Sequence, residues 1–259
     1  MLNTKNIYYS IGKKEILKNI NIYFLPGEFN MILGPNGSGK STFLKIFSGE
    51  LKPTKGEVFV DDKNLSKIKK NELAKVRAVM TQQPELSFPL SVEEVVMMGR
   101  YPHFDFNPAK KDETICDEAF EKMQIEHLKG RNYLTLSGGE KQRVQFARVL
   151  AQIWEKPETG NRYLFLDEPL ANLDINYQQA FLKLAKELVQ FNTVIVAVMH
   201  DINLAIQYAD KLFFLKAGEL VANGKPLDIL SEKLIKEVFD VDTRIITNPI
   251  DGTLLMLYV

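Results

Sequence analysis

One short segment restricts the fold of this chain more than any other part of its sequence. Residues 34–41 read Gly-Pro-Asn-Gly-Ser-Gly-Lys-Ser and satisfy the pattern G-x-x-x-x-G-K-[ST] in full. They follow the apolar run Phe29–Leu33 and precede Ser41–Ser48, whose residues are compatible with a helix. The order of strand, glycine-rich loop and helix is the one that a phosphate-binding α/β unit requires. We therefore expect a phosphate-binding loop at this point of the chain.

Each residue type in this loop suits contact with phosphate groups. Gly37 and Gly39 let the backbone curl so that successive N–H groups point at phosphate oxygens. Lys40 supplies a cation for the β and γ phosphates, and Ser41 offers a hydroxyl to Mg²⁺. The helix that begins near Ser41 adds the positive end of its dipole, roughly half an elementary charge. The alternative is a chance glycine turn, and the position between a strand and a helix argues against it.

The composition is that of an ordinary folded chain with balanced charge. Its 259 residues include 33 Lys and Arg and 33 Asp and Glu, which argues against binding nucleic acid through a basic surface. The single cysteine, Cys116, excludes an internal disulfide and favours a reducing cytoplasm. The N-terminus lacks a signal-peptide pattern, and apolar runs such as Val194–Met199 are far shorter than the roughly 18 residues that span a bilayer. We expect a soluble chain that would reach a membrane only by docking to another protein.

Strand-like and helix-like segments alternate along most of the chain, while residues 83–130 have a helical pattern. Strands are predicted at Thr4–Tyr9, Ile20–Phe24, Phe29–Leu33, Tyr163–Leu166, Thr193–Met199 and Lys211–Leu215. Helices are predicted at Ser41–Ser48, from Ser137 toward Trp154, at Asn176–Val189 and at Ile202–Tyr208. This alternation predicts an α/β fold with a largely parallel sheet covered on both faces, and the helical block is then an insertion into it.

Two carboxylates end the apolar strand predicted at Tyr163–Leu166. Asp167 at the strand end suits a Mg²⁺ ligand that acts through water. Glu168, one residue further on, points elsewhere and can take a proton from an attacking water molecule. Taken alone, the pair is equally compatible with a solvated strand end.

A second glycine-containing segment, residues 136–142, reads Leu-Ser-Gly-Gly-Glu-Lys-Gln. Ser137 followed at the third position by Glu140 is a capping box, which predicts that a helix begins here. Gly138 and Gly139 weaken the interpretation as a plain helix start, because glycine costs a helix about 1 kcal/mol per residue. Two glycines are better explained if exposed N–H groups must approach an anion closely.

Together these segments resemble the motifs of the ATP-binding cassette (ABC) ATPases, and the resemblance covers nearly the whole chain. Gly34–Thr42 matches the Walker A loop, Leu136–Glu140 the signature motif and Leu164–Glu168 the Walker B strand. The Q-loop glutamine, the D-loop, the switch histidine and the aromatic residue that stacks on adenine are matched by Gln82, Ala171–Asp174, His200 and Tyr9. Leu170 replaces the threonine of many members, and Ala171-Asn172 replaces the commoner Ser-Ala, but neither change removes a catalytic group.

The resemblance implies a P-loop cassette with a mostly parallel core sheet, an antiparallel N-terminal part and an inserted helical subdomain. As one domain over residues 1–259, it would place the α/β core at 1–82 and 141–259 and the helical subdomain at 83–140. The implied catalytic residues are Glu168, His200 and Gln82, and the implied Mg²⁺ ligands are Ser41, Gln82 and Asp167. The implied ATP-binding residues are Tyr9, Gly34, Pro35, Asn36, Gly37, Ser38, Gly39, Lys40, Ser41, Thr42, Ser137, Gly138, Gly139, Glu140 and Asp174.

Some side chains keep a second interpretation. Tyr8 is adjacent to Tyr9, and a strand could present either one to adenine. His200 could be a buried histidine at a strand end, although its place after an apolar strand favours contact with the γ-phosphate. His103 is interpreted as a loop residue and not as a haem ligand, and Cys116 as a small apolar helix residue. Met97-Met98 beside Val95-Val96 is compatible with the core, but its location just after Gln82 favours a docking surface, where flexible methionines are useful.

The resemblance also implies partners and a cargo. Two copies would face head to tail with two ATP molecules between them, on two transmembrane permease subunits at the cytoplasmic face of the inner membrane. A substrate-binding protein would act indirectly, and nucleic acid would not be a partner. Residues 77–103 and the helix 138–154 resemble the haem-importer ATPases, so haem import is predicted. The alternatives are a ferric-siderophore or cobalamin importer, and a soluble cassette ATPase of the iron–sulfur assembly type.

Overall fold

A computed structural model describes residues 1–81, 86–157 and 160–259. They form two compact units: residues 1–67 together with 185–259, and residues 68–184. The subdomain boundaries at residues 82–83 and 140–141 stay a prediction.

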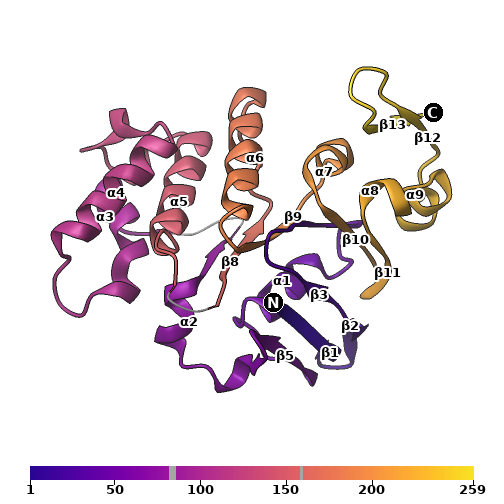
Figure 1. Cartoon of the computed structure of the whole chain (residues 1–259), viewed down its shortest axis with the longest axis horizontal. Helices are drawn as coiled ribbons and strands as arrows, with labels where there is room; N and C mark the ends of the chain where they lie inside the picture. Colours follow the sequence, from indigo (N-terminus) through magenta and orange to yellow (C-terminus); the bar gives the residue numbers. More distant parts are fainter. Residues whose placement is uncertain (82–85, 158–159) are drawn as a thin grey trace. The chain divides into compact units, whose positions relative to one another are not determined.

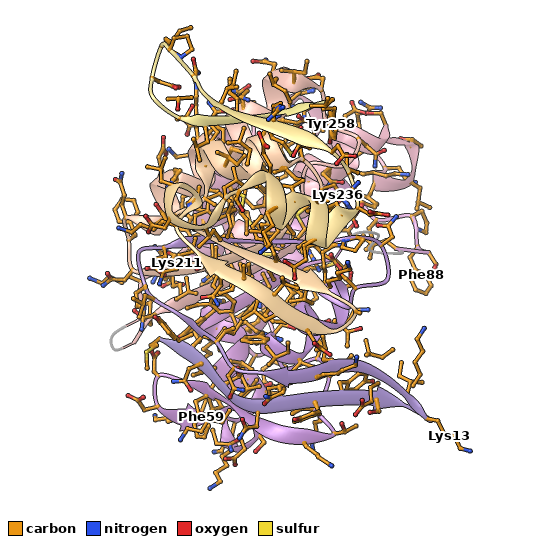
Figure 2. The ribbon with its side chains drawn as sticks, turned by 90° about the vertical axis from the view of Figure 1, so that its right-hand side faces the viewer. Lys13, Phe59, Phe88, Lys211, Lys236 and Tyr258 are labelled. Carbon is orange, nitrogen blue, oxygen red and sulfur yellow. The ribbon has the colours of Figure 1, made fainter. Side chains whose placement is uncertain are left out.

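An antiparallel sheet occupies the N-terminal part of the first unit, where Figure 1 draws its strands side by side. Its strands run in the order β2-β1-β5-β6, and β3 pairs with β1. They are β1 (Leu2–Ile11), β2 (Lys14–Ile20), β3 (Tyr23–Phe24), β5 (Lys55–Val60) and β6 (Lys63–Asn64), with a short 3-10 helix at Leu65–Lys67. Lys13 stands at the tip of the β1–β2 hairpin (Figure 2).

The single strand predicted at Ile20–Phe24 is wrong, because β2 ends at Ile20 and β3 begins at Tyr23. Asn19 has a left-handed backbone with φ 50°. The Asn21 amide donates to the Asn19 carbonyl oxygen and accepts from the Asn6 N–H. These side-chain bonds replace the regular ladder of hydrogen bonds at the break.

The second sheet of the first unit combines buried strands with a partly exposed strand at one edge. Its four strands run in the order β11-β10-β4-β9. They are β4 (Phe29–Leu33), β9 (Thr193–Val198), β10 (Lys211–Lys216) and β11 (Glu219–Gly224). β4 pairs in parallel with both β9 and β10, and every residue of β4 and β9 is buried, as expected for a parallel sheet covered on both faces.

Aromatic packing fixes helix α1 (Lys40–Phe47) in the first unit. Phe43 and Phe47 of α1 stack at 4.3 Å between ring centroids. Phe24 of β3 contacts Phe213 of β10 edge-on at 5.0 Å and Phe47 at 5.4 Å. Because all these rings are buried, the start of α1 is held in one place.

The C-terminal part of the first unit adds helices and a hairpin: α7 (Ile202–Tyr208), α8 (Pro226–Ile229), α9 (Glu232–Phe239), β12 (Thr243–Thr247) and β13 (Leu254–Tyr258). The side-chain amide of Asn203 on α7 pairs with both the N–H (2.8 Å) and the C=O (3.0 Å) of Met256 on β13. The hairpin is thereby tied to α7.

The second unit is mainly helical. Its elements are α2 (Lys70–Val76), β7 (Arg77–Met80), α3 (Val92–Met97), η2 (Met98–His103), α4 (Lys110–Lys122), η3 (Glu126–Leu128), η4 (Tyr133–Thr135), α5 (Gly138–Gln152) and β8 (Arg162–Asp167). Helix α6 (Ile175–Val189) passes from this unit into the first. β7 and β8 pair in parallel. The α/β class, the antiparallel N-terminal part and the helical segment agree with the prediction.

A buried arginine joins three elements of the second unit. Arg100, on η2, donates to Asp112 Oδ1 at 2.9 Å, to the Ala151 carbonyl oxygen at 2.8 Å and to Glu155 Oε2 at 2.5 Å. His103 ends the same 3-10 helix, so its placement in a loop was wrong; its ring Nε2 lies 2.8 Å from the Gln152 carbonyl oxygen. Arg100 thus holds η2 against α4 and the end of α5.

Two further predictions concern this unit and the membrane. Cys116 lies buried in α4, as predicted, and burial raises the pKa of its thiol to about 12. Met97 and Met98 are half-buried, and their docking role stays a prediction. Among the described residues, no helix combines the length and the apolar character needed to cross a bilayer.

Candidate functional site

The glycine-rich segment forms a loop between β4 and α1, as predicted. Gly34 leaves the end of β4, and a Cβ atom there would lie 2.1 Å from the carbonyl oxygen of Leu215. Gly39 has φ 102° and is the N-cap residue of α1. Since neither position accepts a side chain without displacing its neighbours, both glycines are required by the backbone path.

Positive charge gathers inside this loop. Lys40 is 6% exposed, and its Nζ donates to the carbonyl oxygens of Gly34 at 2.8 Å and of Pro35 at 3.0 Å. The N-terminus of α1 contributes the positive end of the helix dipole, and the first turn has no acidic residue. An ammonium group and a helix N-terminus at the same loop favour a bound anion.

A glycine turn outside the sequence motifs supports the loop. The N–H of Gly218, between β10 and β11, donates to the Ser38 carbonyl oxygen at 3.1 Å. Its own carbonyl oxygen accepts from the N–H of Lys18 at 2.8 Å, and a Cβ atom on Gly218 would lie 2.4 Å from the Ile16 carbonyl oxygen. Gly218 therefore joins β2 to the loop. The Ala217-Gly218 turn was visible in the sequence, but this contact was not.

Strand register places His200 level with the loop. Ile32 of β4 pairs with Val198 of β9, so Gly34 and His200 each lie two residues beyond a paired position. The N–H of Met199 donates to the Ile32 carbonyl oxygen at 3.0 Å, which continues the pairing past the strand. His200 is exposed, so the alternative of a buried histidine is wrong.

The two candidate tyrosines differ in their paired strands: β1 has irregular register around both residues, and Tyr9 pairs with β2 while Tyr8 pairs with β5. Tyr9 pairs with Leu17, whose Cδ2 lies 2.8 Å from the position of a Cβ atom on Gly39. Tyr8 pairs with Lys55, whose Nζ is 6.0 Å from the Tyr8 ring centroid. Directly paired residues share a face, so Tyr9 is on the face of β1 that the loop contacts. This arrangement favours Tyr9 for the adenine contact.

In the second unit, β8 carries the two predicted carboxylates at its end. Asp167 is the last residue of the strand and is 6% exposed. Glu168 follows with φ 52°, a left-handed conformation that is uncommon for a residue with a side chain. The predicted difference in direction between the two side chains stays a prediction.

Helix α5 begins at Ser137 with the predicted capping box. Ser137 Oγ accepts from the Glu140 N–H at 3.3 Å, and the Ser137 N–H donates to Glu140 Oε2 at 2.7 Å. The bond from the Ser137 N–H lowers the pKa of the Glu140 carboxyl, and Arg131 adds an ion pair at 3.0 Å. The Glu140 carboxylate therefore takes part in the cap; its predicted contact with ATP stays a prediction.

The paired glycines of this segment have a packing role within the chain. A Cβ atom on Gly139 would lie 3.0 Å from the Asn172 carbonyl oxygen, and one on Gly138 would lie 3.4 Å from Asn172 Cβ. The start of α5 therefore approaches the segment Ala171–Asp174 closely. Asp174 itself accepts from the Tyr177 N–H at 3.0 Å and caps the first turn of α6. The sequence suggests contact with an anion as the reason for these two glycines. Their close packing against Asn172 is a second reason.

A further side chain that the sequence did not single out reaches the Glu168 turn. Gln142 of α5 donates from Nε2 to the Pro169 carbonyl oxygen at 2.8 Å and to that of Glu168 at 3.4 Å. Its position two residues after Glu140 carried no motif signal, because the contact depends on how α5 packs.

The predicted residues thus fall into two groups. The first unit holds Tyr9, Gly34, Pro35, Asn36, Gly37, Ser38, Gly39, Lys40, Ser41, Thr42 and His200. The second unit holds Ser137, Gly138, Gly139, Glu140, Asp167, Glu168 and Asp174, while Gln82 lies outside the described residues. Combination of the two groups in one site stays a prediction.

Comparisons with known proteins agree with the motifs. The profile of the ABC transporter family matches residues 17–171. The hemin import ATP-binding protein HmuV of Gloeobacter violaceus is 44% identical and covers 99% of this chain and 94% of its own.

Two solved structures are similar in fold. One is an inward-facing conformation of a metal-chelate type ABC transporter (TM-score 0.82, 24% identity, 100% of this chain and 96% of that one). The other is a dimeric post-hydrolysis state of the ATP-binding cassette MJ0796 bound to ADP and Pi (TM-score 0.75, 30% identity, 87% and 99%). The predicted family and fold class are confirmed: the chain belongs to the ABC transporter family and is an ATP-binding cassette ATPase.

Proposed function

We propose that this chain is the motor subunit that hydrolyses ATP to drive haem import through a membrane permease. The observation that carries the proposal is the loop at residues 34–42, where the Lys40 ammonium and the N-terminus of α1 place positive charge together. The haem cargo is supported by the 44% identity to a hemin import ATP-binding protein over nearly the full length of both chains.

In the proposed reaction, water attacks the γ-phosphorus of ATP. Glu168 accepts the water proton as the new P–O bond forms, and the bond to the oxygen between the β and γ phosphates breaks. ADP and inorganic phosphate leave as products. Lys40 neutralises negative charge on the β and γ phosphates, and His200 donates a hydrogen bond to the γ-phosphate. Tyr9 stacks on adenine and sets the orientation of the base.

The donor chemistry of two predicted metal ligands fits Mg²⁺. Ser41 offers a hydroxyl and Asp167 a carboxylate, and Mg²⁺ prefers such oxygen ligands. When bound, Mg²⁺ neutralises charge that develops on the β and γ phosphates. Ser41 and Asp167 would hold the ion, together with Gln82.

We further propose that two copies of the chain enclose two ATP molecules, with Ser137, Gly138 and Gly139 of one copy contacting the nucleotide of the other. The dimeric state of the MJ0796 cassette supports this arrangement. The pair would lie at the cytoplasmic face of the inner membrane on two permease subunits, which receive haem from a substrate-binding protein.

The cargo is tested with the chain assembled on its cognate permease in lipid. ATP hydrolysis is measured with haem-loaded binding protein and with the same protein free of haem. We expect faster hydrolysis with the haem-loaded form. Stimulation by a siderophore- or cobalamin-loaded binding protein, and none by haem, would contradict the cargo and leave the ATPase assignment intact. Recovery of the chain in a complex that never includes a permease would instead favour the soluble alternative.

A further inference from the structure

Gln142 joins the helix of the signature segment to the turn that carries Glu168. It lies in the first turns of α5 and is 8% exposed. Its amide Nε2 donates to two successive carbonyl oxygens, those of Glu168 at 3.4 Å and of Pro169 at 2.8 Å. A buried amide that donates to two carbonyls orients both peptide planes at this turn.

The turn needs such support because its backbone is unusual. Glu168 has φ 52° and Asn172 has φ 62°, both in the left-handed region. Such residues cost of the order of 1–3 kcal/mol and persist only when their surroundings hold them. Within the turn, the Ala171 N–H donates to the Glu168 carbonyl oxygen at 3.2 Å, so this oxygen accepts from both the turn and Gln142.

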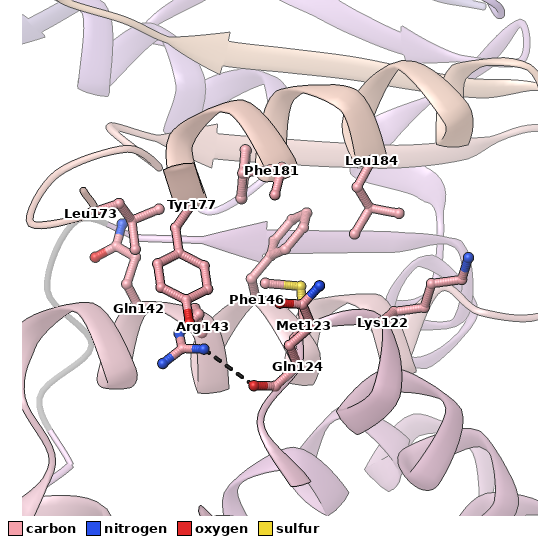
Figure 3. Close-up of a pocket in the computed structure, with 11 residues that line it drawn as sticks. Lys122, Met123, Gln124, Gln142, Arg143, Phe146, Leu173, Tyr177, Phe181 and Leu184 are labelled. Atoms are coloured by element: carbon pink, nitrogen blue, oxygen red, sulfur yellow. Dashed lines mark hydrogen bonds between the residues drawn. The ribbon is translucent and has the colours of Figure 1, made fainter. Parts of the chain in front are cut away.

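The helix that presents Gln142 is itself firmly held. The next residue, Arg143, places its guanidinium 4.1 Å from the Tyr177 ring centroid and donates to the Gln124 carbonyl oxygen at 3.2 Å (Figure 3). One turn later, the rings of Phe146 and Phe181 approach to 4.1 Å between centroids. Contacts with α6 and with the end of α4 therefore fix α5, and α5 fixes Gln142.

We propose that Gln142 is a positioning residue for hydrolysis, which holds the Glu168 backbone so that the carboxylate points at the attacking water. This inference rests on the proposed role of Glu168 as general base. Gln142 acts through Glu168 and transfers no proton itself. Misplacing a catalytic group by about 1 Å can lower a rate about 100-fold, so the loss of these two hydrogen bonds should reach the chemical step.

The first test replaces Gln142 in the full chain. Gln142→Met keeps the length of the side chain and removes both donors, while Gln142→Glu keeps a polar group of the same shape and removes the N–H donors. In both variants we expect kcat for ATP hydrolysis to fall about 10- to 100-fold. The KM for ATP should change less than about twofold, since the lost bonds act at the chemical step. If Gln142→Met fails to fold, Gln142→Glu still tests whether loss of the N–H donors lowers kcat.

Gln145 provides a matched control on the same helix. It is also buried, and its Nε2 donates to the Tyr133 hydroxyl at 2.9 Å, away from the Glu168 turn. Gln145→Met should keep kcat within about twofold of the parent chain, because this contact does not involve the site. An equal loss of kcat in Gln145→Met and Gln142→Met would show a general packing effect and overturn the proposal.

The second test combines Gln142→Met with Glu168→Gln. If Gln142 acts through Glu168, Gln142→Met should lower kcat in the parent chain and cause no further loss once Glu168 is replaced. The same fold-loss in both backgrounds would overturn the positioning role, and so would an unchanged kcat in both Gln142 variants. A Glu168→Gln chain with parental kcat would instead contradict the proposed general base, whatever Gln142 does.

Discussion

At the scale of single residues, glycines and charged side chains lie at the positions where binding and hydrolysis of a phosphate ester would need them. Gly34 and Gly39 occupy positions that a side chain could not share with its neighbours. Lys40 is buried with its ammonium at the loop carbonyls, and Glu168 holds a left-handed backbone at the end of a buried strand. Backbone strain and a buried charge lower the stability of the fold, so their presence at these positions favours a functional role.

The adenine contact gives a prediction at this scale. Tyr9→Ala should weaken ATP binding by roughly 1–3 kcal/mol, the range for aromatic stacking on a nucleic-acid base. Tyr8→Ala should have little effect on affinity, because Tyr8 pairs with Lys55 on the other side of β1. Titration with a fluorescent ATP analogue measures both affinities. Weaker ATP binding by Tyr8→Ala together with parental binding by Tyr9→Ala would show that Tyr8, and not Tyr9, stacks on adenine.

The motif residues could be predicted from sequence because each motif is a continuous segment whose spacing reflects local chemistry. Gln142 and Gly218 could not, because their roles depend on contacts with residues distant in sequence. His103 was misplaced for a related reason. It ends η2, and its ring lies at the carbonyl oxygen of Gln152, a residue distant in sequence.

At the scale of elements, apolar runs predicted the buried strands closely, and the Ser137 capping box predicted the start of α5. β4 matches its predicted span and β9 ends one residue before its predicted end, because both are continuous apolar runs. β7, β11 and β12 were not predicted, since each is short or largely exposed and its residues form no clear pattern. Pairing with neighbouring strands, which the local sequence does not encode, defines them.

Two capping boxes in the second unit give a matched prediction. Ser137 caps α5 with Glu140, and Ser91 caps α3 with Glu94 in the same geometry. Ser137→Ala and Ser91→Ala should each lower the free energy of unfolding by about 0.5–2 kcal/mol, measured by urea denaturation without nucleotide. Only Ser137→Ala should also reduce ATP hydrolysis, because only Ser137 belongs to the proposed ATP contact. Equal losses of hydrolysis would contradict a specific role for Ser137.

The pH dependence of stability tests the hydrogen bond between Ser137 and Glu140 in the α5 cap. The Ser137 N–H lowers the pKa of Glu140 below its ordinary value of 4.5. A lowered carboxyl pKa stabilises the fold above pH 4.5, and this stabilisation is lost as pH falls through the folded-state pKa. The stability difference between the parent chain and Glu140→Gln should therefore be constant near neutral pH and shrink in acid. A difference that grows in acid would contradict the cap geometry.

At the scale of the whole molecule, the predicted residues lie in two compact units, with the phosphate loop and His200 in one and Glu168 and the signature segment in the other. In the proposed dimer, ATP binds the phosphate loop of one copy and the signature segment of the other. Hydrolysis would remove the γ-phosphate and open the dimer. The proposed base, Glu168, therefore controls both turnover and the lifetime of the closed state.

The most direct test of this account is the rate of ATP hydrolysis by the permease-bound complex, compared between the parent chain and Glu168→Gln. We expect Glu168→Gln to bind ATP with near-parental affinity and to turn over about 10²–10⁴ times more slowly, the usual effect of losing a general base. An unchanged hydrolysis rate in that complex would contradict the account.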